Sequence, residues 1–262
     1  MKIDFRLAVA ALPLCILSLA AHACTHIPSR IDPVALPAGN LPNAPDVSLP
    51  RPAQTPLPTQ RYTPRLSIPR LSGEPRLSDF LITPVRATPA AEMLRVDNFI
   101  QRYPSDGQPT TEPTVAYLGY THAYLYAAFV CSDAQPGLIR AHMLARDNLG
   151  DDDFVELVID TFHDQRRAFV FKSNARGIQA DALYSEQNGS DYSFDTVWDT
   201  WGRRTPQGYV VLMRIPFASL YFAKAPEGAM RTWGILLERG ISHANEYVLK
   251  VGIERVDGVQ LA

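Results

Sequence analysis

The sequence is poor in cysteine and carries no large excess of charge of either sign. Three of its 262 residues are cysteine, and 25 lysines and arginines stand against 27 aspartates and glutamates. Small disulfide-stapled domains need several paired cysteines, so that class is excluded. Nucleic-acid binding needs a concentration of basic residues, so we expect no nucleic acid among the partners.

Common catalytic motifs and long helical patterns are also missing. The sequence contains no H-E-x-x-H zinc motif, no G-x-S-x-G nucleophile elbow and no glycine-rich phosphate loop. Its histidines are scattered without a metal-binding partner at helical or hairpin spacing, so we expect them on the surface. From residue 94 onward no apolar repeat of 3.6 residues extends beyond two turns, which argues against a helical core.

One long apolar run is present, and it lies near the N-terminus. Residues 7–21 follow Lys2 and Arg6 and lead into the motif A-H-A. This order of basic, apolar and small-x-small segments predicts a secretory signal peptide over residues 1–23. The run is too short for a comfortable membrane-spanning helix, so we expect export to the periplasm or the cell exterior.

The residue after this motif leaves a second mode of export open. Cys24 would become the first residue of the mature chain and could carry a lipid anchor. Lipoprotein signals usually have a large aliphatic residue three positions earlier, where this chain has Ala21. We therefore expect export without an anchor and keep lipoprotein anchoring as the alternative. Cys131, which ends an apolar run, is expected to be a small core residue.

The segment over residues 24–75 differs in composition from the rest of the chain. It contains about a dozen prolines and almost no aromatic residues. Such a segment cannot bury enough apolar surface to offset the loss of backbone entropy, so we predict an extended, disordered leader. The tetrapeptide P-R-L-S begins at Pro64, Pro69 and Pro75. The repeats fit a semi-rigid spacer, with a segment that docks onto the following domain as the alternative.

The remaining residues, 76–262, have the pattern of an all-β domain. Short alternating apolar runs are separated by turn residues. In the run over 124–131, Leu125 lies on one face and Tyr126 on the other, and both faces are apolar, so we expect this strand at the centre of a sheet. The pattern predicts an antiparallel β-sandwich, with one short connector helix at 138–148.

The most ligand-like stretch surrounds the Asn-Gly turn signal at 188–189. Sugar binding requires an exposed aromatic plane that stacks on the C–H face of a pyranose, with polar groups for the hydroxyls. The candidate carbohydrate-binding residues are Trp201, Trp198, Tyr192, Tyr184, Asp195, Asp199 and Glu186. Trp198 also fits a core position, because its neighbours follow a strand pattern, and both interpretations stay open.

The order of several motifs resembles a known family. They are GYTHAYLYAAFVCSD, RDNLGDDDFVELVIDTF, RRAFVFKSNARGIQAD, FDTVWDT and GYVVLMRIPFASLYF, within residues 71–255. Together they are similar to family 9 carbohydrate-binding modules, in the version that stands N-terminal to a predicted outer-membrane barrel of unknown function in exported bacterial proteins. The resemblance implies a jelly-roll-like sandwich, a carbohydrate ligand, an outer-membrane component as a further partner, and no catalysis by the domain itself.

Two features depart from that family. The barrel region does not follow Ala262, which fits either a truncated member or a freestanding module. Family members clamp a sugar end between two tryptophans, and this chain has Phe154 where relatives often carry tryptophan. The departures put the implied sugar site in doubt.

Three consecutive aspartates, Asp151, Asp152 and Asp153, precede the apolar run V-E-L-V-I-D. Three roles are open: caps that accept hydrogen bonds from nearby backbone or from Arg146, a calcium site, or contacts to sugar hydroxyls. Calcium takes about six to eight oxygen ligands, and the family resemblance includes structural calcium. Adjacent residues of an extended strand point to opposite faces, so these carboxylates converge only if the loop curls at Gly150. We expect the cap role, with calcium as the alternative cofactor.

A glycosidase pair is the remaining catalytic option. Glu156 and Asp160 share one face of a strand at about 13 Å, from a rise of about 3.3 Å per residue. Glycosidase carboxylates lie roughly 5 to 9.5 Å apart, so this pair does not fit. A cross-strand ion pair with Arg166 or Arg167 is expected instead.

These features together predict an exported, noncatalytic carbohydrate-binding module associated with polysaccharide catabolism. The first alternative is a structural or interaction domain of an outer-membrane-associated protein that has lost its sugar site. The second is a glycoside hydrolase, which would need two carboxylates facing each other across a cleft.

Overall fold

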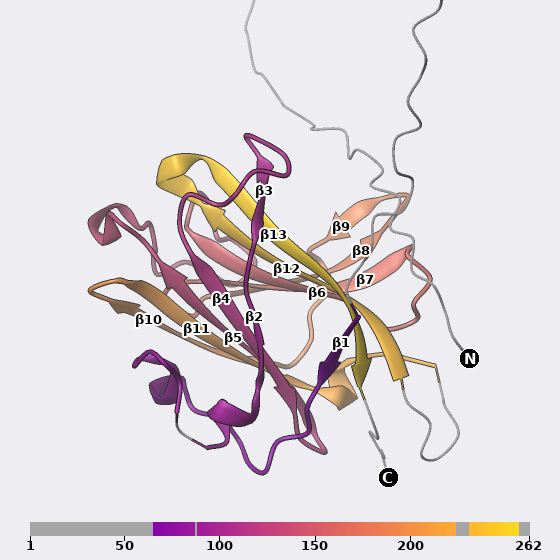
Figure 1. Ribbon diagram of the computed structural model, residues 1–262. Coiled ribbons are helices and arrows are strands. Elements are labelled where there is room, and N and C mark those ends of the chain that lie inside the picture. Colours follow the sequence, from indigo (N-terminus) through magenta and orange to yellow (C-terminus); the bar gives the residue numbers. More distant parts are fainter. Residues whose placement is uncertain (1–64, 87, 224–230, 257–262) are drawn as a thin grey trace, which may run out of the picture. The chain divides into compact units, whose positions relative to one another are not determined.

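The computed structural model describes residues 65–86, 88–223 and 231–256, and these residues form two β-sheets packed face to face (Figure 1). The predicted signal peptide and most of the predicted leader lie outside this part of the chain. Within it, no helix is long and apolar enough to cross a membrane.

The larger sheet has eight strands in the order β1-β13-β12-β6-β7-β8-β9, and β3 pairs with β13 as a branch. Neighbouring strands run antiparallel except β1 and β13, which run parallel. The strands are β1 (Arg65–Ile68), β3 (Ile100–Tyr103), β6 (Phe154–Asp160), β7 (Arg167–Asn174), β8 (Gln179–Ser185), β9 (Gly189–Asp191), β12 (Arg231–Ile241) and β13 (Glu246–Val256).

The smaller sheet has five antiparallel strands in the order β10-β11-β5-β4-β2. They are β2 (Leu94–Val96), β4 (Thr114–Tyr120), β5 (Tyr124–Ser132), β10 (Asp199–Thr205) and β11 (Gly208–Pro216). The helices of the described residues are single 3-10 turns, namely η1 (Leu77–Phe80), η2 (Ala90–Glu92), η3 (Pro136–Leu138), η4 (Phe217–Ser219) and η5 (Ser242–Ala244). The predicted antiparallel β-sandwich is confirmed.

The main hydrophobic core lies between the two sheets and follows the alternation of the strands. On β5, Leu125 and Phe129 are fully buried in this core, and Leu157 of β6 and Phe171 of β7 meet them from the larger sheet. Burial of each such side chain stabilises the fold by about 1.5–3 kcal/mol. The other face of β5 is apolar as well, and the strand occupies the predicted central position.

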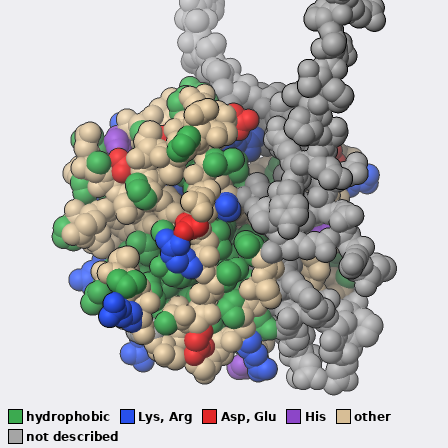
Figure 2. Space-filling view, in the orientation of Figure 1, with side chains coloured by type: hydrophobic (Ala, Val, Ile, Leu, Met, Phe, Trp, Pro, Cys, Tyr) green, Lys and Arg blue, Asp and Glu red, His purple; other side chains and the backbone are tan. Residues whose placement is uncertain are grey.

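A second cluster covers the outer face of the smaller sheet. Leu71, Phe80 and Met93, from the segment ahead of β2, pack on Tyr126 and Leu212 of the sheet. In the space-filling view, hydrophobic side chains gather on the lower half of this face, with lysine and arginine side chains around them (Figure 2). This cover explains why both faces of β5 are apolar.

The predicted leader extends too far, because residues 65–75 belong to the sandwich. Strand β1 hydrogen-bonds to β13, and Leu71 is buried in the second cluster. Leu66 and Leu77 pack against the two clusters, so each P-R-L-S copy contributes one leucine to the body. The repeats therefore dock onto the sandwich, as the alternative interpretation predicted. A segment of low average hydrophobicity can pack on a domain in this way because its few apolar side chains are buried there.

The predicted connector helix at 138–148 is wrong, because only the preceding turn η3 is helical. The backbone N–H of Arg140 donates to the Asp153 carboxylate at 3.1 Å, and that of His142 donates to Asp152 at 2.8 Å. In a helix beginning at residue 138, the N–H of His142 would bond to the carbonyl of residue 138, and Asp152 takes this donor instead. Aspartate side chains compete with helix formation in this general way.

Strand β10 lies very close to the turn that joins β7 to β8. A Cβ atom placed on Gly202 would stand 2.4 Å from the amide nitrogen of Gly177 and 2.8 Å from the carbonyl of Ala175. Both obstacles are backbone atoms that cannot rotate away. Glycine at this position therefore lets the edge strand, with Trp201 on it, sit against the turn.

The close approach predicts the effect of a methyl group at this position. We expect Gly202→Ala to lower the free energy of unfolding by about 2–3 kcal/mol, because the added carbon overpacks against fixed backbone. The matched control is Gly137→Ala, where no heavy atom lies within 4 Å of the new carbon. Urea unfolding measures both variants, and equal midpoints would contradict the close approach.

Candidate functional site

The edge strand β10 presents the one open tryptophan of the chain. Trp201 is 41% exposed, whereas Trp198 is 3% and Trp233 is 2% exposed. Thr200 and Gly202 on either side turn inward, where Thr200 Oγ1 lies 3.1 Å from Ser173 Oγ. Because strand residues alternate, Trp201 faces outward on the smaller sheet.

Arg214 organises the surface around this ring. It lies on β11 opposite Asp199 of β10, and its Nε and Nη2 donate to Asp199 Oδ2 at 3.0 and 2.8 Å. The hydrogen bond with Asp199 raises the pKa of Arg214. The guanidinium carbon is 5.4 Å from the Trp201 ring centroid and 4.9 Å from that of Tyr124. Glu74 accepts a further bond from Nη1 at 3.2 Å, so the cation is held on several sides.

An open pocket of about 320 Å³ adjoins Trp201, at the lower end of the size range of small-molecule sites. Its lining residues are Leu144, Arg146, Gly177, Ile178, Gln179, Asp199, Thr200 and Trp201. The pocket combines charged, amide and hydroxyl groups with the indole. Such a lining can accept and donate hydrogen bonds to a polyhydroxylated ligand.

Arg146 anchors one side of this pocket through two carboxylates. Its Nη2 donates to Asp181 Oδ1 at 2.5 Å and lies 2.7 Å from Asp195 Oδ1. Asp181 is fully buried and also accepts hydrogen bonds from the Trp198 indole at 3.2 Å and the Thr196 backbone at 2.8 Å. Asp195, one of the predicted carbohydrate-binding residues, therefore forms an ion pair with Arg146.

Trp198 is buried in the core, as one of its two interpretations predicted. Its ring meets Phe171 edge-on with centroids 5.2 Å apart. A ring enclosed in this way has no open face for stacking. We therefore leave Trp198 out of the candidate surface and treat it as the core support beneath the start of β10.

The remaining candidates lie on the other sheet. Tyr184 is on β8, Glu186 is exposed just after it, and Tyr192 follows β9. Since Asp181 of β8 turns toward the core, Tyr184 three positions later faces the opposite side of that strand. Desolvation raises the pKa of Tyr192. The structure thus divides the predicted set between the two sheets, with Trp201 and Asp199 on the smaller one.

Two glutamates stand side by side on the outer face of the larger sheet. Glu156 of β6 is the direct cross-strand partner of Glu238 of β12 and of Lys172 of β7. Burial raises the pKa of Glu156, and burial together with the Glu156 charge raises that of Glu238 to about 7. Lys172 Nζ lies 3.7 Å from Glu156 Oε2 and 3.4 Å from the Phe154 ring centroid.

This arrangement corrects the expected ion pairs of Glu156 and Asp160. Glu156 pairs with Lys172, while Arg167 pairs with Asp164 at 2.9 Å. Asp160 instead accepts backbone N–H bonds from the following hairpin turn, including those of residues 163 and 165 at 2.7 and 2.8 Å. Its carboxylate is therefore committed to holding the turn.

Two of the three consecutive aspartates, Asp152 and Asp153, act as backbone caps. Asp152 accepts hydrogen bonds from the His142 backbone and the Asn174 side chain, each at 2.8 Å. Asp153 is fully buried and caps the Arg140 N–H, and desolvation raises its pKa. Of the two expected kinds of donor, the backbone is the one observed, whereas Arg146 pairs with Asp181 and Asp195. The cap role expected for these two carboxylates is therefore the one that the described contacts bear out.

Arg214, Tyr124 and Glu74 were not among the candidates. Arg214 is a lone charged residue within the apolar run V-V-L-M-R-I. This pattern is the sequence feature that could have indicated a functional role for it. Tyr124 and Glu74 come from segments far away in sequence. Only the folded chain brings them to β10.

No protein-family model and no curated protein matches the chain. Among solved structures, a proposed carbohydrate-binding protein from Bacteroides uniformis is similar with a TM-score of 0.53 and 11% identity, over 74% of this chain and 100% of that one. A family 9 carbohydrate-binding module from Caldicellulosiruptor kristjanssonii in complex with glucose has a TM-score of 0.48 and 14% identity, over 76% of this chain and 98% of the other. The first likeness shows that the chain shares the fold of that Bacteroides protein.

The paired glutamates predict how stability depends on pH. Because the folded-state pKa of Glu238 is raised, the folded chain binds more protons than the unfolded chain between the ordinary glutamate pKa and about 7. The free energy of unfolding should therefore fall as pH rises through that window. We expect Glu238→Gln to flatten this dependence and to be more stable than the parent at about pH 8.

Urea unfolding at several pH values between about 5 and 8 measures the effect. Glu186→Gln removes an exposed carboxylate outside the pair and should leave the curve unchanged. If the free energy of unfolding changed equally with pH in the parent and in the Glu238 variant, the raised pKa of Glu238 would be contradicted.

Proposed function

We propose that the chain is a noncatalytic carbohydrate-binding module that holds its ligand on the exposed face of Trp201. The observation that carries the proposal is this ring, 41% exposed, set beside the Arg214–Asp199 pair and an open polar pocket. Sugars present an apolar C–H face and a rim of hydroxyls, and a ring with polar neighbours matches both.

The polar groups of this surface are held in place before any ligand arrives. Arg214 is fixed by Asp199 and Glu74, and Gln179 donates from its side chain to the Trp198 carbonyl at 2.8 Å. Ordering side chains on binding costs about 0.5–1.5 kcal/mol each, so a preformed surface binds more tightly than a mobile one. The unused lone pairs of Asp199 and Glu74 would accept hydroxyl protons.

The cellular setting of the proposed function rests on the sequence. The basic and apolar N-terminal pattern indicates export to the periplasm or beyond, with Cys24 as an alternative lipid anchor. The family resemblance adds a role in polysaccharide catabolism and an outer-membrane component as partner. In that setting the module would keep an exported protein close to a polysaccharide.

One observation favours a second candidate, a structural or interaction domain without a sugar site. Asp195 and Asp199 are both engaged in ion pairs, with Arg146 and Arg214. Trp198 is buried, so the described residues supply no tryptophan pair at this surface. The two candidates differ in whether Trp201 contacts a saccharide.

Titration of the full chain with mono- and oligosaccharides of plant, bacterial and host origin tests the proposal. Because Trp198 and Trp233 are buried, a change in tryptophan fluorescence would report mainly on Trp201. We expect Trp201→Ala to weaken binding at least about tenfold, the scale of one lost contact of about 1.4 kcal/mol.

The matched control is Tyr221→Ala, which removes another exposed ring, 69% exposed and on the segment after η4. Its affinity should stay within about twofold of the parent. Calorimetry without heat for any saccharide, or equal affinities for the parent and the Trp201 variant, would refute binding at this surface and leave the structural domain.

A further inference from the structure

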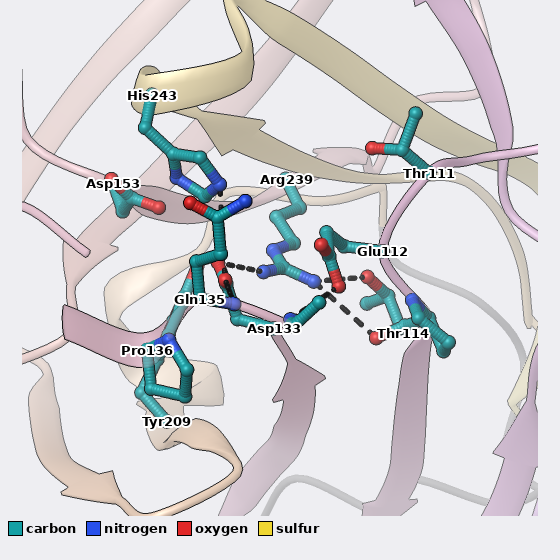
Figure 3. Close-up of polar contacts among 12 residues, drawn as sticks. Thr111, Glu112, Thr114, Asp133, Gln135, Pro136, Asp153, Tyr209, Arg239 and His243 are labelled. Atoms are coloured by element: carbon teal, nitrogen blue, oxygen red, sulfur yellow. Dashed lines mark hydrogen bonds and ion pairs between the residues drawn. The ribbon is translucent and has the colours of Figure 1, made fainter. Parts of the chain in front are cut away.

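A second group of polar residues lies at one end of the sandwich, away from Trp201. Glu112 precedes β4, Asp133 follows β5, and His243 lies in η5 between β12 and β13. One ligand atom of each residue lies within 4.8 Å of the others. Figure 3 shows these three side chains around the guanidinium of Arg239. Three segments far apart in sequence thus meet at one point.

Several buried polar atoms of this group lack a hydrogen bond within the described chain. They are Asp133 Oδ2, Asp153 Oδ2, Arg239 Nε and Nη2, and His243 Nδ1. The side chains of Asp133 and Arg239 are 0% exposed, and the two approach to 3.7 Å. A buried polar atom without a partner costs about 1–3 kcal/mol, so a concentration of them indicates a polar ligand.

The charges of the group decide the sign of that ligand. Two carboxylates, those of Glu112 and Asp133, lie beside the single guanidinium of Arg239 in this group. Buried charge is tolerated only when it is compensated, and this group has a surplus of negative charge. A divalent cation would remove the surplus.

The carboxylate of Asp133 is held in place by its neighbours. Its Oδ2 faces Arg239, and its Oδ1 lies 3.8 Å from His243 Nε2 and accepts the Gln135 backbone N–H at 2.7 Å. On the other side Glu112 Oε2 accepts the Ala134 N–H at 2.9 Å. Such outer contacts fix ligating carboxylates in known metal sites. Arg239 is thus a positioning residue.

The ligand types select the class of metal. Imidazole nitrogen with two carboxylate oxygens suits zinc and similar transition metals, whereas calcium prefers oxygen ligands alone. At metal–ligand distances of about 2.0–2.2 Å, ligand atoms around one zinc ion lie roughly 3–4 Å apart, and the observed spacing is compatible after small side-chain shifts.

We propose that Glu112, Asp133 and His243 bind one zinc-type divalent ion, with water completing its coordination. The ion joins the loop ahead of β4, the end of β5 and the β12–β13 turn. Because it binds the folded chain and not the unfolded one, it stabilises the fold by mass action. This role does not depend on carbohydrate binding at Trp201.

The test uses the full chain freed of metal with a chelator and then dialysed. Zinc, manganese, calcium and magnesium chlorides are added separately, and thermal unfolding and calorimetry are measured. We expect one zinc ion per chain and a rise of the unfolding midpoint of roughly 5 °C at saturating zinc. Calcium and magnesium should give little change.

The variant His243→Gln should abolish the zinc-dependent rise, and Glu112→Gln should reduce it. The control variant His122→Gln changes an exposed histidine in the β4–β5 turn, and it should show the same zinc-dependent rise of the unfolding midpoint as the parent. Cobalt(II) added to the parent should give the visible absorption of a four- or five-coordinate site, which reports binding even if a variant fails to fold. No zinc stoichiometry, a rise that survives in the His243 variant, or selectivity for calcium would overturn the proposal.

Discussion

Buried carboxylates that collect backbone hydrogen bonds are the interaction on which the rest of this fold depends. Desolvating a carboxylate is costly, so each one must gather donors. Asp152 and Asp153 take donors from the irregular segment after η3, and Asp181 gathers Arg146, the Trp198 indole and the Thr196 backbone. These bonds give defined positions to segments without regular structure, and those segments wall the pocket beside Trp201.

The two outer faces of the sandwich have different chemistry because their charges are compensated differently. On the smaller sheet Arg214 pairs with Asp199 and Glu74 and lies beside the aromatic rings of Trp201 and Tyr124. On the larger sheet Glu156 and Glu238 share one lysine, so the pair is under-compensated and its protonation follows pH. The first face therefore carries a fully paired cation, and the protonation of the second depends on pH.

The strands and their core faces could be predicted from the sequence, and the site only in part. Alternation placed Leu125 and Leu157 in the core because a two-residue period is a local property. The sequence predicts a helix at 138–148 because the competing acceptors, Asp152 and Asp153, reach this segment only in the folded loop. Likewise Glu112, Asp133 and His243 show no motif spacing, since the strand order alone brings them together. Trp201 could be predicted as a candidate because it lies in a stretch where aromatic residues alternate with aspartates.

The position of β10 at the rim of its sheet has a consequence for behaviour at high concentration. A rim strand offers unpaired backbone groups to which a strand of a neighbouring molecule can add. Arg203 and Arg204 are both exposed there, and their like charges would meet their own copies if two chains approached rim to rim. The same strand that leaves an indole open to solvent thereby carries its own protection against self-assembly.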